Sequence, residues 1–136
     1  MELLMKTLIV EDDFTSRLLM QKMLAQFGAE SHIAVNVKEA LAAFRQALVE
    51  KSPYDLVCLD IMMPEMDGQT ALREMRQVEM GYGVQAGDGA KIIMTSALRD
   101  PRNVATAYKE FCDAYVSKPI DRAQFADELR NLKLIP

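Results

Sequence analysis

The sequence has few of the features that mark secreted or metal-clustered proteins. It contains two cysteines and one histidine among 136 residues, and neither Cys58 nor Cys112 belongs to a CxxC pair. Two distant cysteines in apolar surroundings make neither a disulfide framework nor a zinc knuckle, so we expect two buried, reduced thiols. This cysteine usage favours a cytoplasmic protein.

Long apolar runs and basic clusters are also missing. No segment approaches the ~20 apolar residues of a membrane span, and the opening MELLMKTLIV leads into acids rather than a signal-peptide cleavage site. A net charge of −4 without a run of Lys or Arg argues against direct nucleic-acid binding, which needs clustered cations. The length predicts one soluble domain covering residues 1–136, with no membrane insertion.

Short apolar runs alternate with segments of helical periodicity. Strands are predicted at 6–11, 30–35, 54–60, 91–95 and 114–117. Apolar residues recur at i, i+3, i+4 and i+7 in segments such as 20–27 and 40–47, which is typical of amphipathic helices. Five strands alternating with five helices predict an α/β fold, with a five-stranded parallel sheet covered by helices on both faces.

Helix boundaries are marked by capping residues. Asn36, Asp100 and Asp121 stand where helices are expected to begin, and Asp100 is followed by proline. Gly28 is placed to end the first helix. The glycine-rich segment 80–89 predicts a flexible loop before the fourth strand, away from the active edge of the sheet. It lacks the GK[ST] ending of a phosphate-binding loop and follows a helix instead of a strand.

Polar residues gather where the predicted strands end. They are Glu11, Asp12 and Asp13 after the first strand, Asp60 after the third, Thr95 and Ser96 after the fourth, and Lys118 after the fifth. The carboxyl ends of parallel strands share one edge, so these side chains are expected to meet. Carboxylates this close repel one another unless a cation offsets their charge, and oxygen ligands suit Mg²⁺. A carboxylate beside such a cation can accept a phosphoryl group. The metal-free site is therefore expected to be strained.

Four blocks, LIVEDD, LDIMMPEMDG, IIMTSA and AYVSKP, together resemble the receiver domains of bacterial two-component response regulators, of the single-domain chemotaxis type. The resemblance covers about residues 6–132. It implies a flavodoxin-like receiver fold and a phosphorylation-controlled signalling switch, not a turnover enzyme. A sensor histidine kinase or a histidine phosphotransfer protein would supply the phosphoryl group, in a reaction that depends on Mg²⁺ or Mn²⁺.

The resemblance also implies roles for individual residues. Asp60 would be the phosphoacceptor, and Lys118 would contact the phosphoryl group. The cation would be held by Asp60 and Asp12, by Glu11 largely through water, and by the backbone carbonyl of Met62.

Other positions are expected to act as a switch or to have structural roles. Ser96 would be the switch hydroxyl, with Thr95 as its competitor, because Ser96 directly precedes an alanine and stands at the family's usual interval before the lysine. Tyr115 would change rotamer with it. Asp13 is expected to cap the first helix instead of binding metal. Pro119 would follow a cis peptide bond.

Output and signal lifetime can also be predicted from the resemblance. A downstream protein would bind the face built from the fourth helix, fifth strand and fifth helix, through Val104, Tyr108 and Tyr115. Met62 and Leu98 flank the phosphoryl position in the family and are apolar here, so they cannot orient an attacking water. We therefore expect slow self-dephosphorylation, testable by comparing phosphoryl half-lives of the wild type and Met62→Asn.

Alternative functions remain open at this point. The chain could be a phosphorelay intermediate, a receiver fragment of a larger regulator, or a phosphorylation-independent interaction module. A haloacid-dehalogenase-type phosphatase would need an acid two residues after its nucleophile, where this sequence has Met62. The sole histidine, His32, has no evident carboxylate partner and is not expected to donate phosphoryl groups. No output domain is expected after Leu132.

Overall fold

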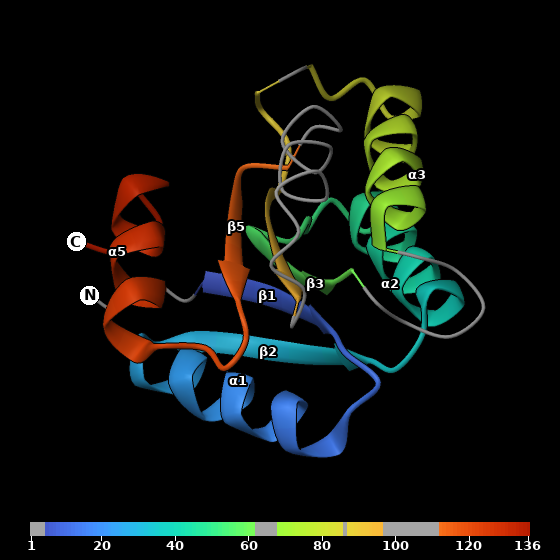
Figure 1. The fold of residues 1–136 in the computed structure, drawn as a ribbon. Coiled ribbons are helices and arrows are strands. Elements are labelled where there is room, and N and C mark those ends of the chain that lie inside the picture. Colours follow the sequence, from blue (N-terminus) through green and yellow to red (C-terminus); the bar gives the residue numbers. More distant parts are fainter. Residues whose placement is uncertain (1–4, 62–67, 86, 97–111) are drawn as a thin grey trace.

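The computed structural model describes residues 5–61, 68–85, 87–96 and 112–136. In this part the chain forms a five-stranded sheet with helices on both faces (Figure 1). The strands are β1 (Met5–Val10), β2 (Ala29–Ala34), β3 (Leu56–Asp60), β4 (Lys91–Ser96) and β5 (Ala114–Ser117). The helices are α1 (Phe14–Gln26), α2 (Val37–Val49), α3 (Gly68–Gly81) and α5 (Arg122–Asn131). The further helix expected from Asp100 lies outside the described residues. No helix in the described part is long and apolar enough to cross a membrane.

Each predicted strand is present, with small shifts at its ends. The largest shift is at β3, where Tyr54 and Asp55 precede the strand instead of opening it. Asp55 bonds back to β1, because its carboxylate accepts from the Lys6 N–H at 2.9 Å and its own N–H donates to the Lys6 carbonyl at 2.8 Å. β1 stops at Val10, one residue before the predicted end at Glu11.

The sheet has the strand order β2-β1-β3-β4-β5, and every neighbouring pair is parallel. β2, which follows β1 in the chain, lies at one edge of the sheet. The strands that follow β3 extend toward the opposite edge. A crevice at the carboxyl ends of β1 and β3 is the usual ligand position in such a sheet. The predicted doubly wound α/β fold is confirmed, and it brings Glu11 next to Asp60.

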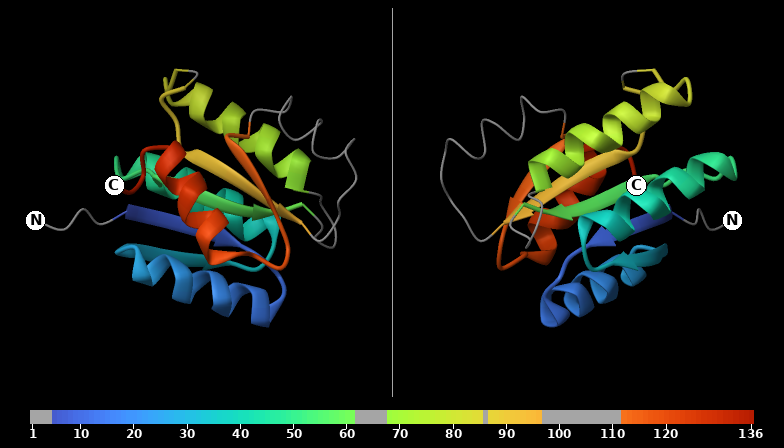
Figure 2. Two further views of the ribbon diagram at one scale, coloured as in Figure 1. Left: turned by 60° about the vertical axis from the view of Figure 1, so that its left-hand side comes forward. Right: turned by 90° about the vertical axis from the view of Figure 1, so that its right-hand side faces the viewer.

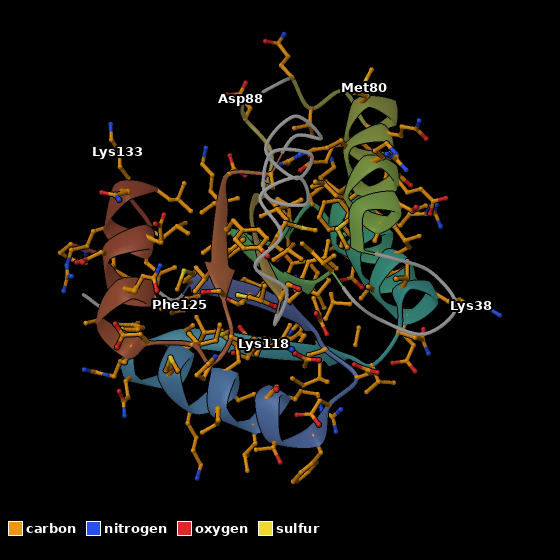
Figure 3. The ribbon with its side chains drawn as sticks, viewed as in Figure 1. Lys38, Met80, Asp88, Lys118, Phe125 and Lys133 are labelled. Carbon is orange, nitrogen blue, oxygen red and sulfur yellow. The ribbon has the colours of Figure 1, made fainter. Side chains whose placement is uncertain are left out.

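Two apolar cores lie on the two faces of the sheet. α2 and α3 cover one face, and α1 and α5 cover the other (Figure 2). β3 is buried along its whole length, as its continuous apolar sequence predicts. Phe125 lies between α5 and the sheet with 0% of its surface exposed (Figure 3). Burying a side chain of this size stabilises the fold by about 1.5–3 kcal/mol.

The predicted helix caps are present among the described residues, whereas Asp100 lies outside them. The carboxylate of Asp13 accepts a hydrogen bond from the Ser16 N–H at 2.8 Å, and Asp121 accepts from Gln124 at 3.3 Å. The amide oxygen of Asn36 accepts from Glu39 at 2.8 Å. After α1, Gly28 adopts a φ of 79°, a left-handed conformation that glycine takes without steric cost.

The glycine-rich segment is tied down by a network of charged side chains. α3 continues through Gly81, and the carboxylate of Glu79, near its end, accepts a hydrogen bond from the Ala90 N–H at 2.8 Å. Arg76 bridges Glu79 and Asp113, at 2.9 Å to each. The sequence predicted a flexible loop here. The i,i+3 spacing of Arg76 and Glu79 could have indicated their ion pair, but nothing in the sequence indicated their contacts with Asp113 and Ala90.

This network lies at the end of the sheet away from the acidic edge. Met80 and Asp88 are at the top of the molecule, while Lys118 lies well below them, near the centre of the view (Figure 3). The loop leads into the amino end of β4, whereas Lys118 follows the carboxyl end of β5. The expectation that the loop stays away from the active edge is therefore confirmed.

Both cysteines are free thiols, as expected. Cys58 is fully buried in β3, and its burial raises its pKa to about 12. Cys112 is only half-buried, so the expectation of two buried thiols was wrong for this residue. Partial burial, aided by the nearby charge of Asp113, raises the pKa of Cys112 to about 11.

Candidate functional site

Three carboxylates meet at the carboxyl edge of the sheet. Glu11 and Asp12 follow β1, and Asp60 is the last residue of β3. One oxygen from each lies within 4.8 Å of the others. Glu11 and Asp60 are 5% and 4% exposed, whereas Asp12 is exposed. The predicted acidic cluster therefore forms, because β1 and β3 are neighbours in the sheet.

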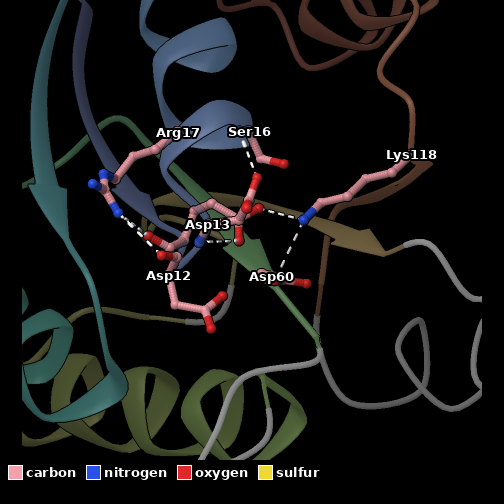
Figure 4. A network of polar contacts seen from close by, with 7 residues as sticks. Asp12, Asp13, Ser16, Arg17, Asp60 and Lys118 are labelled. Atoms are coloured by element: carbon pink, nitrogen blue, oxygen red, sulfur yellow. Dashed lines mark hydrogen bonds and ion pairs between the residues drawn. The ribbon is translucent and has the colours of Figure 1, made fainter.

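Lys118 approaches this cluster from β5 (Figure 4). Its ammonium forms an ion pair with Glu11 and a second one with Asp60 at 3.4 Å. The Lys118 N–H donates to the carbonyl of Ser96 at 2.8 Å, which joins the end of β4 to the lysine. The peptide bond before Pro119 is cis, as predicted.

The site perturbs the pKa values of two of its groups. Burial raises the pKa of Glu11, and the Asp60 charge adds to this, while the hydrogen bond with Lys118 partly opposes it. For Lys118, burial alone would lower the pKa, but Glu11 and Asp60 together outweigh it and raise the pKa. The lysine is therefore held as a cation among carboxylates.

The loop between β1 and α1 is held by hydrogen bonds among its own residues and the start of α1. The N–H of Asp13 donates to the Glu11 carboxylate at 3.2 Å. The Asp13 side chain caps α1 through Ser16, and this hydrogen bonding lowers the pKa of Asp13. Asp13 thus has the predicted capping role. It is not part of the three-carboxylate cluster found among the described residues.

Two buried hydroxyl residues end β4. Thr95 is 3% exposed and stands in register with Asp60, while Ser96 is 0% exposed and stands in register with Ser117. Both residues are therefore near the acceptor, and the choice of Ser96 as the switch hydroxyl stays a prediction. Tyr115 in β5 is half-buried and packs against the core under α2 and α3.

Several predicted site residues lie outside the described part of the chain. They are Met62, Leu98, Val104 and Tyr108. The carbonyl ligand, the apolar flanks of the phosphoryl position and two residues of the output face therefore stay predictions.

The structure also reveals contacts that sequence reasoning missed. The guanidinium of Arg17 donates to the backbone carbonyls of Glu11 and Asp12 (Figure 4). The only hint of these contacts in the sequence is that an arginine stands about one turn into the helix that follows Glu11 and Asp12.

The expectation that His32 lacks a carboxylate partner was wrong. Its Nε2 lies 3.2 Å from a carboxylate oxygen of Glu30, and its Nδ1 lies 2.9 Å from the Tyr54 hydroxyl. Residues two apart in a strand share a face, so the spacing of Glu30 and His32 could have indicated the pair.

The donor set suits a hard divalent cation. Mg²⁺ favours oxygen ligands and usually binds through one or two carboxylates with several waters. The described part of the chain offers three carboxylates here, one of them exposed to solvent, and a lysine able to pair with anionic oxygens. Such a site can accommodate a cation and a phosphoryl group together.

Comparison with known proteins places this geometry in a family. The model of the response regulator receiver domain matches residues 7–130. The chain is 32% identical over 139 residues to histidine kinase CKI1 of Arabidopsis thaliana, an alignment covering 94% of this chain and 12% of the relative. It is 30% identical over 137 residues to probable histidine kinase 2 of Oryza sativa subsp. indica, covering 94% and 13%. The chain thus spans a small part of these relatives.

Solved structures agree with the sequence relatives. The receiver domain of CKI1 complexed with Mg²⁺ has a TM-score of 0.82 and 29% identity, covering 94% of this chain and 91% of that one. Chemotaxis protein CheY4 of Vibrio cholerae shares the fold, with a TM-score of 0.78, 22% identity and coverage of 96% and 99%. The chain therefore belongs to the response regulator receiver domain family, which consists of phosphoaccepting signalling switches.

Proposed function

We propose that this chain acts as a single receiver domain in which Asp60 accepts a phosphoryl group from a histidine kinase or a histidine phosphotransfer protein. The observation that carries the proposal is the position of the Asp60 carboxylate. It is 4% exposed, at the carboxyl end of β3, beside two further carboxylates and 3.4 Å from the Lys118 ammonium.

The residues present fit the divalent cation that the proposal requires. Glu11, Asp12 and Asp60 would hold Mg²⁺ or Mn²⁺, together with the backbone carbonyl of Met62, which is outside the described residues. The related CKI1 receiver domain has been solved as a Mg²⁺ complex, which supports this assignment. When bound, the cation would neutralise negative charge on the phosphoryl oxygens and on the carboxylates.

The chain's own residues account for the transfer. A carboxylate oxygen of Asp60 attacks the phosphorus, a new O–P bond forms, and the P–N bond of the donor phosphohistidine breaks. The bond electrons stay with the imidazole nitrogen, which takes up a proton. The Lys118 ammonium lies next to Asp60 and offsets the charge that builds up on the phosphoryl oxygens.

The proposed output is a change in a protein-binding face. Phosphorylation would draw the hydroxyl of Ser96 toward the phosphoryl group and change the rotamer of Tyr115. Tyr115 is half-buried on β5, so part of the residue is exposed to solvent. The remaining candidates, Val104 and Tyr108, lie outside the described residues. We place this switch in the cytoplasm and assign it no substrate turnover.

A phosphorelay intermediate is the second candidate function. The observation favouring it is the similarity of this chain to segments of histidine kinases. The matched segments make up 12–13% of the length of these kinases. A relay domain would pass its phosphoryl group from Asp60 to a second histidine protein. An output switch would instead hold it while bound to a target.

The test is the intact mass of the protein after incubation with acetyl phosphate, with and without Mg²⁺. We expect a gain of one phosphoryl group in the wild type that requires Mg²⁺ and is absent from Asp60→Asn. Calorimetric titration with MgCl₂ serves as the parallel measurement. A wild type that binds Mg²⁺ but gains no mass from acetyl phosphate or from a phosphorylated histidine donor would favour a phosphorylation-independent interaction module.

A further inference from the structure

The side chain of Arg17, near the start of α1, hydrogen-bonds to the backbone of the loop between β1 and α1. Its Nη1 donates to the carbonyl of Glu11 at 3.3 Å and to that of Asp12 at 3.2 Å (Figure 4). The guanidinium carbon also lies 5.5 Å from the centre of the Phe14 ring. The guanidinium therefore contacts both the loop backbone and an aromatic ring of its own helix.

The two carbonyls belong to the residues that supply two of the three clustered carboxylates. The side chain of Glu11 is further fixed by Lys118 and by the Asp13 N–H. The side chain of Asp12 is exposed and takes part in no ion pair among the described residues. Its position at the site therefore depends on the backbone that carries it, and Arg17 holds that backbone.

The charge of Arg17 and its hydrogen bonds have opposite consequences for cation binding. A guanidinium near the site repels a bound cation, so charge alone predicts tighter binding once it is removed. Hydrogen bonds that orient metal-ligating residues raise affinity, and their loss typically weakens binding by 10–100-fold. Cation affinity therefore separates the two effects.

We infer that Arg17 is a positioning residue that fixes the backbone of Glu11 and Asp12 for divalent-cation binding. The inference rests on the proposed function, because it concerns the same site. Arg17 does not touch the phosphoryl group in this role. It acts through the two carbonyls and through the Asp12 carboxylate that they orient.

The test compares Mg²⁺ affinity by calorimetric titration for the wild type, Arg17→Gln and Arg17→Lys. We expect Mg²⁺ to bind about tenfold more weakly to Arg17→Gln. This is the low end of the effect seen for groups that orient metal ligands, because the guanidinium is partly exposed. Arg17→Lys should lose less, because an ammonium can still reach a loop carbonyl. Arg45→Gln is the matched control, removing the same charge from the exposed face of α2, and should leave affinity unchanged.

A second measurement excludes a general structural effect. At saturating Mg²⁺, Arg17→Gln should reach the wild-type rate of mass gain from acetyl phosphate, since the reacting groups are intact. In the metal-free state, the amide NMR signals of Glu11 and Asp12 in Arg17→Gln should be shifted relative to those of the wild type. Equal or tighter Mg²⁺ binding by both Arg17 variants would overturn the inference. A wild type that does not bind Mg²⁺ would instead contradict the proposed function.

Discussion

The ammonium of Lys118 pairs with the carboxylate of Glu11, although the two residues stand 107 positions apart and follow different strands. The same ammonium reaches Asp60 at 3.4 Å. One lysine therefore faces three clustered carboxylates, and the metal-free site keeps an excess of negative charge. The stability of the domain should respond to any change that reduces this charge.

The first prediction concerns the buried acceptor carboxylate. Asp60→Asn should raise the free energy of unfolding of the metal-free protein by about 1 kcal/mol. A like-charge contact near 4 Å costs about 4 kcal/mol at an effective dielectric of 20, and the loss of the Lys118–Asp60 contact offsets much of that gain. Urea unfolding in EDTA measures the effect.

Mg²⁺ provides the internal control for this prediction. The wild type should gain about 1.4 kcal/mol at a Mg²⁺ concentration ten times its Kd, by mass action. The gain should be smaller for Asp60→Asn at the same concentration. A metal-free Asp60→Asn protein less stable than the wild type would show that repulsion does not strain the site.

The second prediction concerns the approach of Gly89 to Glu79. A Cβ built on Gly89 would overlap the carboxylate of Glu79. This carboxylate cannot move away freely, because its Oε2 accepts from the Ala90 N–H and its Oε1 pairs with Arg76. Gly89→Ala should therefore destabilise the protein by about 1–3 kcal/mol, measured by urea unfolding.

Gly81→Ala is the matched control for this variant. Nothing lies within 4 Å of a Cβ at Gly81, and alanine is the better helix former at the end of α3. Its stability should equal or slightly exceed that of the wild type. Neither variant should alter the mass gain from acetyl phosphate, because this loop is at the opposite end of the sheet. Equal stability of the two variants would contradict the proposed packing of Glu79.

The third prediction separates the two hydroxyls at the end of β4. Ser96→Ala should remove most of the change in the Tyr115 ring NMR signals that follows phosphorylation, because the proposed switch acts through that hydroxyl. Thr95→Val should retain it, although Thr95 stands directly beside Asp60 in the sheet. The reverse result would assign the switch hydroxyl to Thr95.

The fourth prediction concerns the pH dependence of the two thiols. With pKa values raised to about 12 for Cys58 and about 11 for Cys112, both should react slowly with a disulfide reagent near neutral pH. Between about pH 8 and about pH 10, Cys112 should react first, because its thiolate fraction is larger and it is half-exposed. A Cys112→Ala variant isolates the slower thiol. Faster reaction of Cys58 would contradict this order.

The same shifts predict how stability changes at alkaline pH. A thiol whose pKa is raised in the folded state contributes stability that is fully present below its unfolded pKa, near 9. That contribution is lost as the pH rises toward the folded values of about 11 and 12. Replacing Cys58 by alanine should therefore flatten the alkaline fall in the free energy of unfolding.

Much of the fold could be predicted because its signals are local. The continuous apolar sequence of β3 is what a strand buried on both faces requires, and the structure buries all five residues. The caps at Asp13, Asn36 and Asp121 each involve a backbone N–H three residues later, so the sequence alone contains both partners. The strand-end positions of Glu11 and Asp60 likewise follow from the pattern.

Contacts between distant segments depended on the tertiary structure. The sequence by itself determined the alternating elements, the parallel sheet and the set of acids, hydroxyls and lysine at one edge. Only the packing of the chain decided that Lys118 pairs with Glu11 as well as Asp60, and that Arg76, which pairs with Glu79 along α3, also reaches Asp113. The physical reason is that a charged side chain takes whichever partner the strand order and the crossover connections bring within reach, and sequence spacing does not encode that choice.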